Sequence, residues 1–141
     1  MLGGCSSASK TIDNSSNLKI KYYRADKTSL PSGEYFYKMM SDTCSALPSL
    51  WQKVRPSYFP IAIKAGLQGD VLVRIFVNAE GQVYKAQIMR SDIELFNQDA
   101  IDATMQWRFT PYMENCVEKE FVAEVPISFR LSNGRPNVLL P

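Results

Sequence analysis

The clearest hydrophobic pattern lies between residues 71 and 77, where β-branched residues alternate with Leu72, Arg74 and Phe76. Every second position there is β-branched, namely Val71, Val73, Ile75 and Val77. A period of two is typical of a strand that buries one face. The segment Asn78–Gly81 that follows is rich in turn residues. Residues 82–90 are therefore predicted to return as a second strand, antiparallel to the first.

The alternation returns near the end of the chain. One face of this segment carries Phe121, Ala123, Val125, Ile127, Phe129 and Leu131. Pro126 lies in its middle, and a proline has no backbone N–H to donate to a neighbouring strand. We therefore expect this segment to form an edge strand, with one side of its backbone open.

A helical period separates the second strand from the third. One stripe of this helix consists of Phe96, Ala100, Ala103 and Trp107. A shorter helix is predicted over residues 60–66, since Pro60 suits the first helical position and Gly66 suits the end. The predicted fold class is α+β. It is a two-layer domain with a three-stranded antiparallel sheet and two helices on one face, in the order α-β-β-α-β.

The parts of the chain differ in composition. Residues 1–33 are mostly polar and cannot bury enough apolar surface to offset their ordering entropy, so we expect a lipobox-like N-terminus and a flexible tether. Residues 34–55 are richer in apolar side chains. We interpret them as an N-terminal extension that packs on the domain, with a docking surface for a partner as the alternative. The domain is expected over residues 56–134, with a tail over residues 135–141.

Charge and composition argue against several classes of function. The formal net charge of +2 is small, and Lys and Arg are interleaved with Asp and Glu, which argues against nucleic-acid binding. The chain contains no His, the commonest general base and a frequent zinc ligand. It has no Gly-rich phosphate loop, no Cys-x-x-Cys pair and no apolar run long enough to span a membrane. We therefore expect that the protein is not an enzyme and that it binds no cofactor and no metal ion.

The cysteines suggest two further features. Leu2-Gly3-Gly4-Cys5 resembles the lipobox of bacterial lipoproteins, which makes Cys5 a candidate lipidation site. Either residue 1 falls inside a longer signal peptide or this short match is accidental. Cys44 and Cys116 then remain as an even pair. They are candidates for a disulfide in an oxidising compartment, with two separate thiols as the alternative.

Several short motifs follow one another over residues 57–131. They are Phe59-Pro60, Gly66, Gly69, the strand over residues 71–77, Gly81, Trp107-Arg108-Phe109 with Pro111, and Pro126-Ile127-Ser128-Phe129. Each motif is common by itself. In this order they resemble the C-terminal domain of the TonB family of periplasmic energy transducers.

The resemblance implies a domain that binds a peptide. Members of this family connect a proton-driven motor complex of the inner membrane to outer-membrane receptors, and the domain adds a short receptor segment to its own sheet. The residues expected to supply the strand edge are Val125, Ile127, Ser128, Phe129, Arg130 and Leu131. Those expected to flank the groove are Arg55, Ser57, Tyr58 and Phe59. The alternatives are an edge blunted against aggregation and a homodimer formed by edge pairing.

Two roles are consistent with the resemblance. The first is a component of energy-dependent transport, which engages an outer-membrane TonB-dependent receptor or another envelope protein from the periplasm of a Gram-negative bacterium. The second is a passive envelope lipoprotein that uses the same domain as a protein-interaction or assembly module. The membrane helix and Pro-rich spacer of the family have no counterpart in this sequence, so a lipid anchor at Cys5 is the expected membrane attachment.

Overall fold

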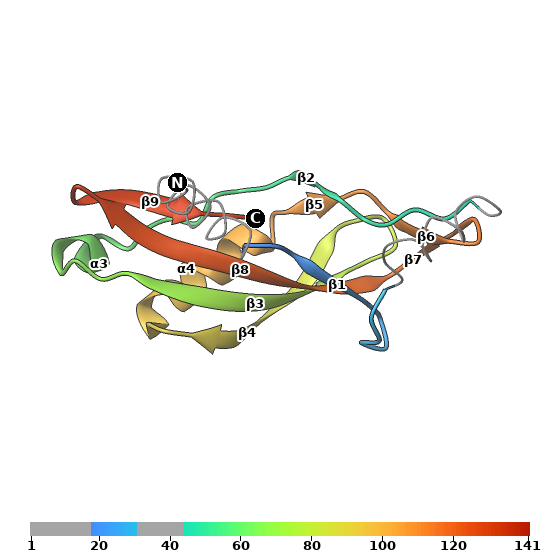
Figure 1. Cartoon of the computed structure of the whole chain (residues 1–141), viewed down its shortest axis with the longest axis horizontal. Helices are drawn as coiled ribbons and strands as arrows, with labels where there is room; N and C mark the ends of the chain where they lie inside the picture. The colour runs from blue at the N-terminus through green and yellow to red at the C-terminus, as the bar shows by residue number, and fades with distance from the viewer. Residues whose placement is uncertain (1–17, 31–43) are drawn as a thin grey trace, which may run out of the picture.

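The computed structural model describes residues 18–30 and 44–141 of the chain. Its main sheet has five antiparallel strands, in the order β1-β8-β3-β4, with β9 also paired to β8 (Figure 1). These strands are β1 (Lys21–Arg24), β3 (Gly69–Val77), β4 (Val83–Ser91), β8 (Phe121–Ser132) and β9 (Arg135–Leu139). The long strand β8 is therefore the one to which three other strands pair.

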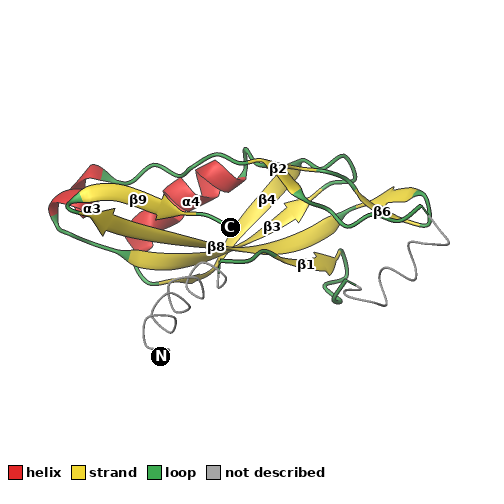
Figure 2. Ribbon diagram, turned by 45° about the horizontal axis from the view of Figure 1, so that its top comes forward, coloured by secondary structure: helices red, strands yellow, loops and turns green. Residues whose placement is uncertain are grey.

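The helices are short and lie on the same side of the sheet (Figure 2). They are α3 (Pro60–Lys64), the 3-10 helix η1 (Glu94–Phe96) and α4 (Asn97–Thr104). Two small sheets complete the fold. They pair β2 (Leu50–Gln52) with β5 (Arg108–Phe109), and β6 (Tyr112–Glu114) with β7 (Val117–Lys119).

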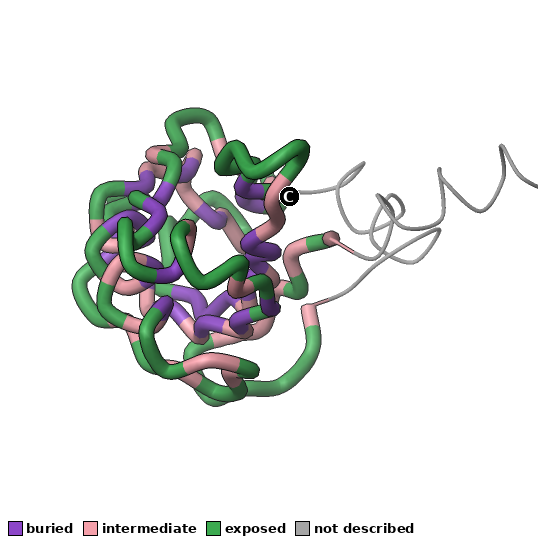
Figure 3. Tube along the Cα trace, turned by 90° about the vertical axis from the view of Figure 1, so that its left-hand side faces the viewer, coloured by how far each residue is buried: buried purple, intermediate pink, exposed green. Residues whose placement is uncertain are grey.

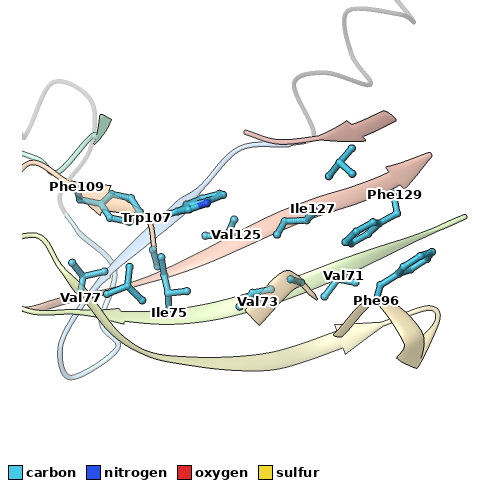
Figure 4. Packing of buried hydrophobic residues seen from close by; sticks show 14 of the residues in the cluster. Val71, Val73, Ile75, Val77, Phe96, Trp107, Phe109, Val125, Ile127 and Phe129 are labelled. Carbon is cyan, nitrogen blue, oxygen red and sulfur yellow. The ribbon is translucent and has the colours of Figure 1, made fainter. Parts of the chain in front are cut away.

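The core lies between the sheet and α4. The side chains of β3 and β8 that face the helix are almost fully buried, and they come from the alternating positions that the sequence pattern identifies (Figure 4). Phe96 stacks on Phe129 with 4.3 Å between ring centroids. Trp107 is fully buried, and its indole N–H donates to the carbonyl of Val54 at 2.9 Å. In the end-on view of Figure 3, the buried stretches lie inside a ring of exposed loops.

The α+β class with an antiparallel sheet and short helices is confirmed. The elements α3, β3, β4, α4 and β8 follow one another in the expected order, with the short strands β5, β6 and β7 inserted between α4 and β8. The prediction of three strands is wrong, because the sheet has five. The two additional strands come from segments expected to be a tether and a tail. Each of them contributes an apolar side chain to the core, partly buried Tyr22 from β1 and Val138 from β9, which is 3% exposed. The sequence pattern underestimated these segments because most of their other residues are polar.

The edge position expected for the last strand is also wrong. Strand β8 pairs with β3 along one side and with β1 and β9 along the other. The reasoning from Pro126 failed because it treated the strand as a single unit. Pro126 requires an unpaired neighbour position only at its own place in the strand, and no described strand pairs with β8 on that side of Pro126.

A disulfide joins Cys44 to Cys116, with 4.7 Å between their Cα atoms. The predicted bridge is therefore present in the structure. Next to it, Ala46 and Met113 exchange two backbone hydrogen bonds of 2.9 Å, so the segment after Cys44 runs antiparallel to β6. Residues 34–43 of the expected extension, and Cys5, lie outside the described residues.

Candidate strand-addition site

The outer edge of β8 divides into three parts. Residues Phe121–Glu124 pair with β1, and residues Ser128–Ser132 pair with β9. Between them, no described residue pairs with the outer side of Val125–Ile127, which we call the gap. Because β1 and β9 are both antiparallel to β8, they run in the same direction, one after the other, along a single edge (Figure 1).

Pro126 lies at the centre of the gap. The amide of Leu131 donates to the side chain of Gln68, on the side of β3, at 2.7 Å. Amide direction alternates along an antiparallel strand, so Pro126, an odd number of positions away, directs its nitrogen away from β3 and into the gap. The missing N–H therefore costs no hydrogen bond to β3. The register between β3 and β8 runs on without a break where Leu72 lies opposite Pro126.

Strand β9 is held on the edge by three features. The turn before it places Asn133 and Gly134 at φ 53° and 75°, the left-handed pair of a two-residue hairpin. Val138 is its one buried side chain, since the other four residues of the strand are exposed. From outside the sheet, the guanidinium of Arg55 donates to the carbonyl of Val138. Apart from its five-residue backbone pairing with β8, β9 therefore depends on few side-chain contacts.

The predicted flank residues divide into two groups. Arg55 reaches the edge through β9, while Ser57 and Phe59 are exposed nearby in the chain. Tyr58 is a core residue instead, with its ring edge-on to Phe96 at 5.3 Å and to Phe129 at 5.6 Å.

The predicted edge residues offer mainly their backbone. Val125, Ile127 and Phe129 are fully buried, so their side chains support the sheet from beneath. Ser128 and Arg130 lie on the outer face, where each donates to Asp70 at 2.7 Å. Leu131 is partly buried against the core.

The outer face beside the gap carries a shallow depression that sequence reasoning missed. Its volume is about 490 Å³, and its lining includes Leu72, Pro126 and Leu139 together with Asp70 and Arg90. Apolar and charged groups meet there because no described helix covers this face of the sheet. A peptide lying along the gap would extend its outward side chains over this depression.

Strand β1 is fixed by polar side chains. Glu124 accepts hydrogen bonds from the Tyr23 hydroxyl at 3.1 Å and from Arg74 at 2.8 Å. The hydrogen bond from Arg74 is the main reason why the pKa of Glu124 lies below its ordinary value. Burial raises the pKa of Tyr22 to about 12. The Tyr22 hydroxyl therefore stays protonated at neutral pH.

The opposite edge of the sheet, β4, is less suited to strand addition. Among the described residues no strand pairs with its outer side. However, its register shifts twice, and the extra residues at these bulges are Tyr84 and Met89. Lys85 adds a charge. Bulges and lysines are devices that keep a strand edge from pairing with another chain.

Within the described residues, none of the helices has the length and apolar character needed to cross a bilayer. The same residues contain no cluster of three or more side chains suited to hold a metal ion.

Comparison with known sequences gives a consistent result. A family model described as "Gram-negative bacterial TonB protein C-terminal" matches residues 54–131. "Protein TonB" of Vibrio cholerae serotype O1 is 35% identical over 80 residues, which are 56% of this chain and 33% of that protein. "Protein tonB2" of Pseudomonas aeruginosa is 32% identical over 78 residues, or 55% of this chain and 29% of that protein. The chain thus spans about a third of the length of the curated relatives it matches.

The solved structures give a matching fold. The solution NMR structure of the Pseudomonas aeruginosa TonB CTD superimposes with a TM-score of 0.53 at 21% identity, covering 60% of this chain and 87% of that one. The residues matched by the family model, 54–131, contain α3, β3, β4, α4 and nearly all of β8. Strands β1 and β9 both lie outside them.

Proposed function

Because this chain belongs to the TonB C-terminal family, we propose that its domain binds an extended segment of an outer-membrane transporter by strand addition to β8. The family membership agrees with the expectation that the chain is not an enzyme. The chain would act from the periplasm-facing side of the cell envelope, as expected of a Gram-negative member of this family.

The observation that carries the proposal is the occupancy of the β8 edge. Two strands from outside the family-matched residues already add to it, and both do so through the backbone. Main-chain pairing depends little on side chains, so an edge that accepts β1 and β9 has the geometry to accept a foreign strand. The same edge belongs to residues 54–131, which the chain shares with its relatives.

The incoming segment would take the gap and the place of β9. This stretch of β8 contains the expected edge residues, Val125 and Ile127–Leu131. Strand β9 relies on one buried side chain, Val138, for its packing on the core, since its other residues are exposed. Arg55, released from the Val138 carbonyl, would then be free to contact the new strand.

The role in the envelope is the second part of the proposal. In the transport role, the peptide contact would carry force from an inner-membrane proton-driven motor complex to the transporter. In the passive role, the same contact would serve assembly, with Cys5 as lipid anchor. Both roles need the same peptide site, so measuring peptide binding is the first test.

The test uses the full chain and a synthetic peptide with the periplasm-facing N-terminal segment of an outer-membrane transporter from the same bacterium. Val138→Asp places a charge at the buried position of β9, while the control Asn137→Asp makes the same charge change at an exposed neighbour. Losing the burial of a valine costs about 2 kcal/mol. Strand β9 would then open roughly 30-fold more often, and peptide affinity would rise accordingly.

We expect isothermal titration calorimetry to show tighter binding to the Val138→Asp variant and an unchanged affinity for the Asn137→Asp control. The amide signals of residues 125–131 should shift on binding. No binding to any variant, or binding that leaves these signals in place, would contradict the proposal.

A further inference from the structure

Strand β1 contacts its part of the β8 edge through side chains as well as through the backbone. Its four residues pair with Phe121–Glu124, and three of them make specific contacts with the domain. These contacts differ from those of β9, whose one buried side chain is an aliphatic one. The occupant of this half of the edge therefore shows what chemistry the edge selects.

The first contact is an aromatic socket. The ring of Tyr22 lies edge-on to Phe109, with 6.3 Å between centroids, and tilted against Phe121 at 5.9 Å. Aromatic pairs at such distances and angles contribute stability beyond the area that they bury. Phe109 and Phe121 are themselves about 1% exposed, so the socket is a rigid part of the core.

The second and third contacts are polar and acidic. Glu124 accepts a hydrogen bond from the hydroxyl of Tyr23. Glu114, on β6, accepts two from the guanidinium of Arg24, at 3.3 and 3.4 Å. Both carboxylates belong to the domain, where Glu124 also pairs with Arg74 at 2.8 Å and Glu114 with Lys119 at 3.7 Å. The surface that β1 covers therefore combines an aromatic socket with two carboxylate acceptors.

Strand β1 is an addition to the family fold, since it lies outside residues 54–131. It is four residues long and pairs on the sheet with β8 alone. A segment so short and so placed can detach without disturbing β3, β4 or the helices.

We propose that the β8 edge at Phe121–Glu124 is a second peptide site, selective for an extended cationic segment, and that β1 is its resting occupant. The preferred segment has an aromatic residue opposite Ala123, a hydroxyl or amine donor next to it, and an arginine after that donor. This site is separate from the one covered by β9, and it takes a different class of ligand.

The test measures binding of a fluorescent peptide with the sequence of residues 20–25, Ile-Lys-Tyr-Tyr-Arg-Ala, to the full chain. Tyr22→Ala empties the socket in the protein, and Tyr84→Ala makes the same change on exposed β4 as a control. We expect fluorescence anisotropy to give at least tenfold tighter binding to Tyr22→Ala than to the wild type or the control. The amides of residues 121–124 should shift in the complex.

Peptide variants test the selectivity without altering the fold. Replacing the first tyrosine of the peptide by Ala, or its Arg by Gln, should weaken binding to the Tyr22→Ala protein at least fivefold. If Tyr22→Ala fails to fold, Arg24→Ala weakens β1 at a partly buried position outside the aromatic socket and serves instead. Absence of binding to the weakened variant, or equal binding of the altered peptides, would overturn the proposal. The transporter peptide and Val138→Asp report on the other half of the edge, so either site can fail alone.

Discussion

Gly81 offers a sharp test of how the turn after β3 holds the core in place. It has φ +89°, and its carbonyl accepts a 2.9 Å hydrogen bond from the amide of Phe109. A Cβ added there would lie 1.9 Å from the carbonyl oxygen of Phe109. A backbone atom cannot rotate away as a side chain can. Gly81→Ala must therefore push Phe109 outward, and Phe109 is a wall of the Tyr22 socket.

The expected loss of stability has two parts. The left-handed backbone costs an L-residue about 1–2 kcal/mol. The clash adds a lost hydrogen bond, about 1 kcal/mol, and partial unpacking of a buried phenylalanine. We expect a total of about 3 kcal/mol, or a Tm lower by about 12 °C.

Gly66 provides the matched control. It also has positive φ, at +68°, but no atom lies within 4 Å of an added Cβ. Gly66→Ala should therefore cost only the backbone part, about 1–2 kcal/mol. Urea denaturation followed by circular dichroism measures both variants. Equal losses for the two variants would refute the reasoning, because the close approach to Phe109 would then contribute nothing.

Three further predictions follow from single contacts. Replacing Cys44 and Cys116 together by Ser opens a loop closed across a sequence separation of 72, and should lower the free energy of unfolding by up to about 4 kcal/mol in urea titrations. Arg74 and, less strongly, the Tyr23 hydroxyl of β1 lower the pKa of Glu124. The hydrogen bond from Tyr23 therefore stabilises docked β1 above the unfolded pKa of that carboxylate, and this contribution is lost as pH falls through its folded pKa. The protection factors of the β1 amides, which are corrected for the slower intrinsic exchange at low pH, should therefore fall on acidification, and Glu124→Gln should remove that pH dependence. Arg55→Ala should accelerate exchange in β9 without changing the overall Tm by more than about 2 °C, because its bond to β9 is peripheral.

The alternating patterns predicted which side chains face the core. The β-branched positions of residues 71–77 and the odd positions of residues 121–129 are buried as expected. The stripe of Phe96, Ala100, Ala103 and Trp107 is buried too, although the α-helix ends at Thr104. Side-chain periodicity predicts which face of a helix or strand is buried, and these predictions are confirmed.

Periodicity carries no information about which neighbour lies beside a strand in the sheet. Strands β1 and β9 have the sequences Lys-Tyr-Tyr-Arg and Arg-Pro-Asn-Val-Leu, which show too few apolar residues for a pattern. They become strands because the β8 edge offers unpaired backbone groups and an apolar rim. That is tertiary context, which overrides local preference in strands more than in helices.

The entry into α4 also depends on tertiary context, although Ser91 and Asp92 before it are residue types suited to an N-cap. Ser91 ends β4, and Asp92 accepts a hydrogen bond from the amide of Asp70 at 2.9 Å across the sheet. The chain then enters α4 through a 3-10 turn that has no side-chain cap. The Asp92 side chain therefore does not cap the helix, because it accepts its hydrogen bond from β3 instead.

The gap alone is too small to hold a partner. It offers the outward backbone groups of Pro126, which has a carbonyl but no N–H, and a hydrogen bond contributes only about 0.5–1.5 kcal/mol. Association costs at least about 4 kcal/mol in lost translational and rotational freedom. A peptide must therefore displace β1 or β9 to gain enough pairs, and its apparent affinity falls by the fraction of time that the strand it replaces is docked. The stability of these two short strands, rather than the shape of the edge, then sets how tightly a partner is held.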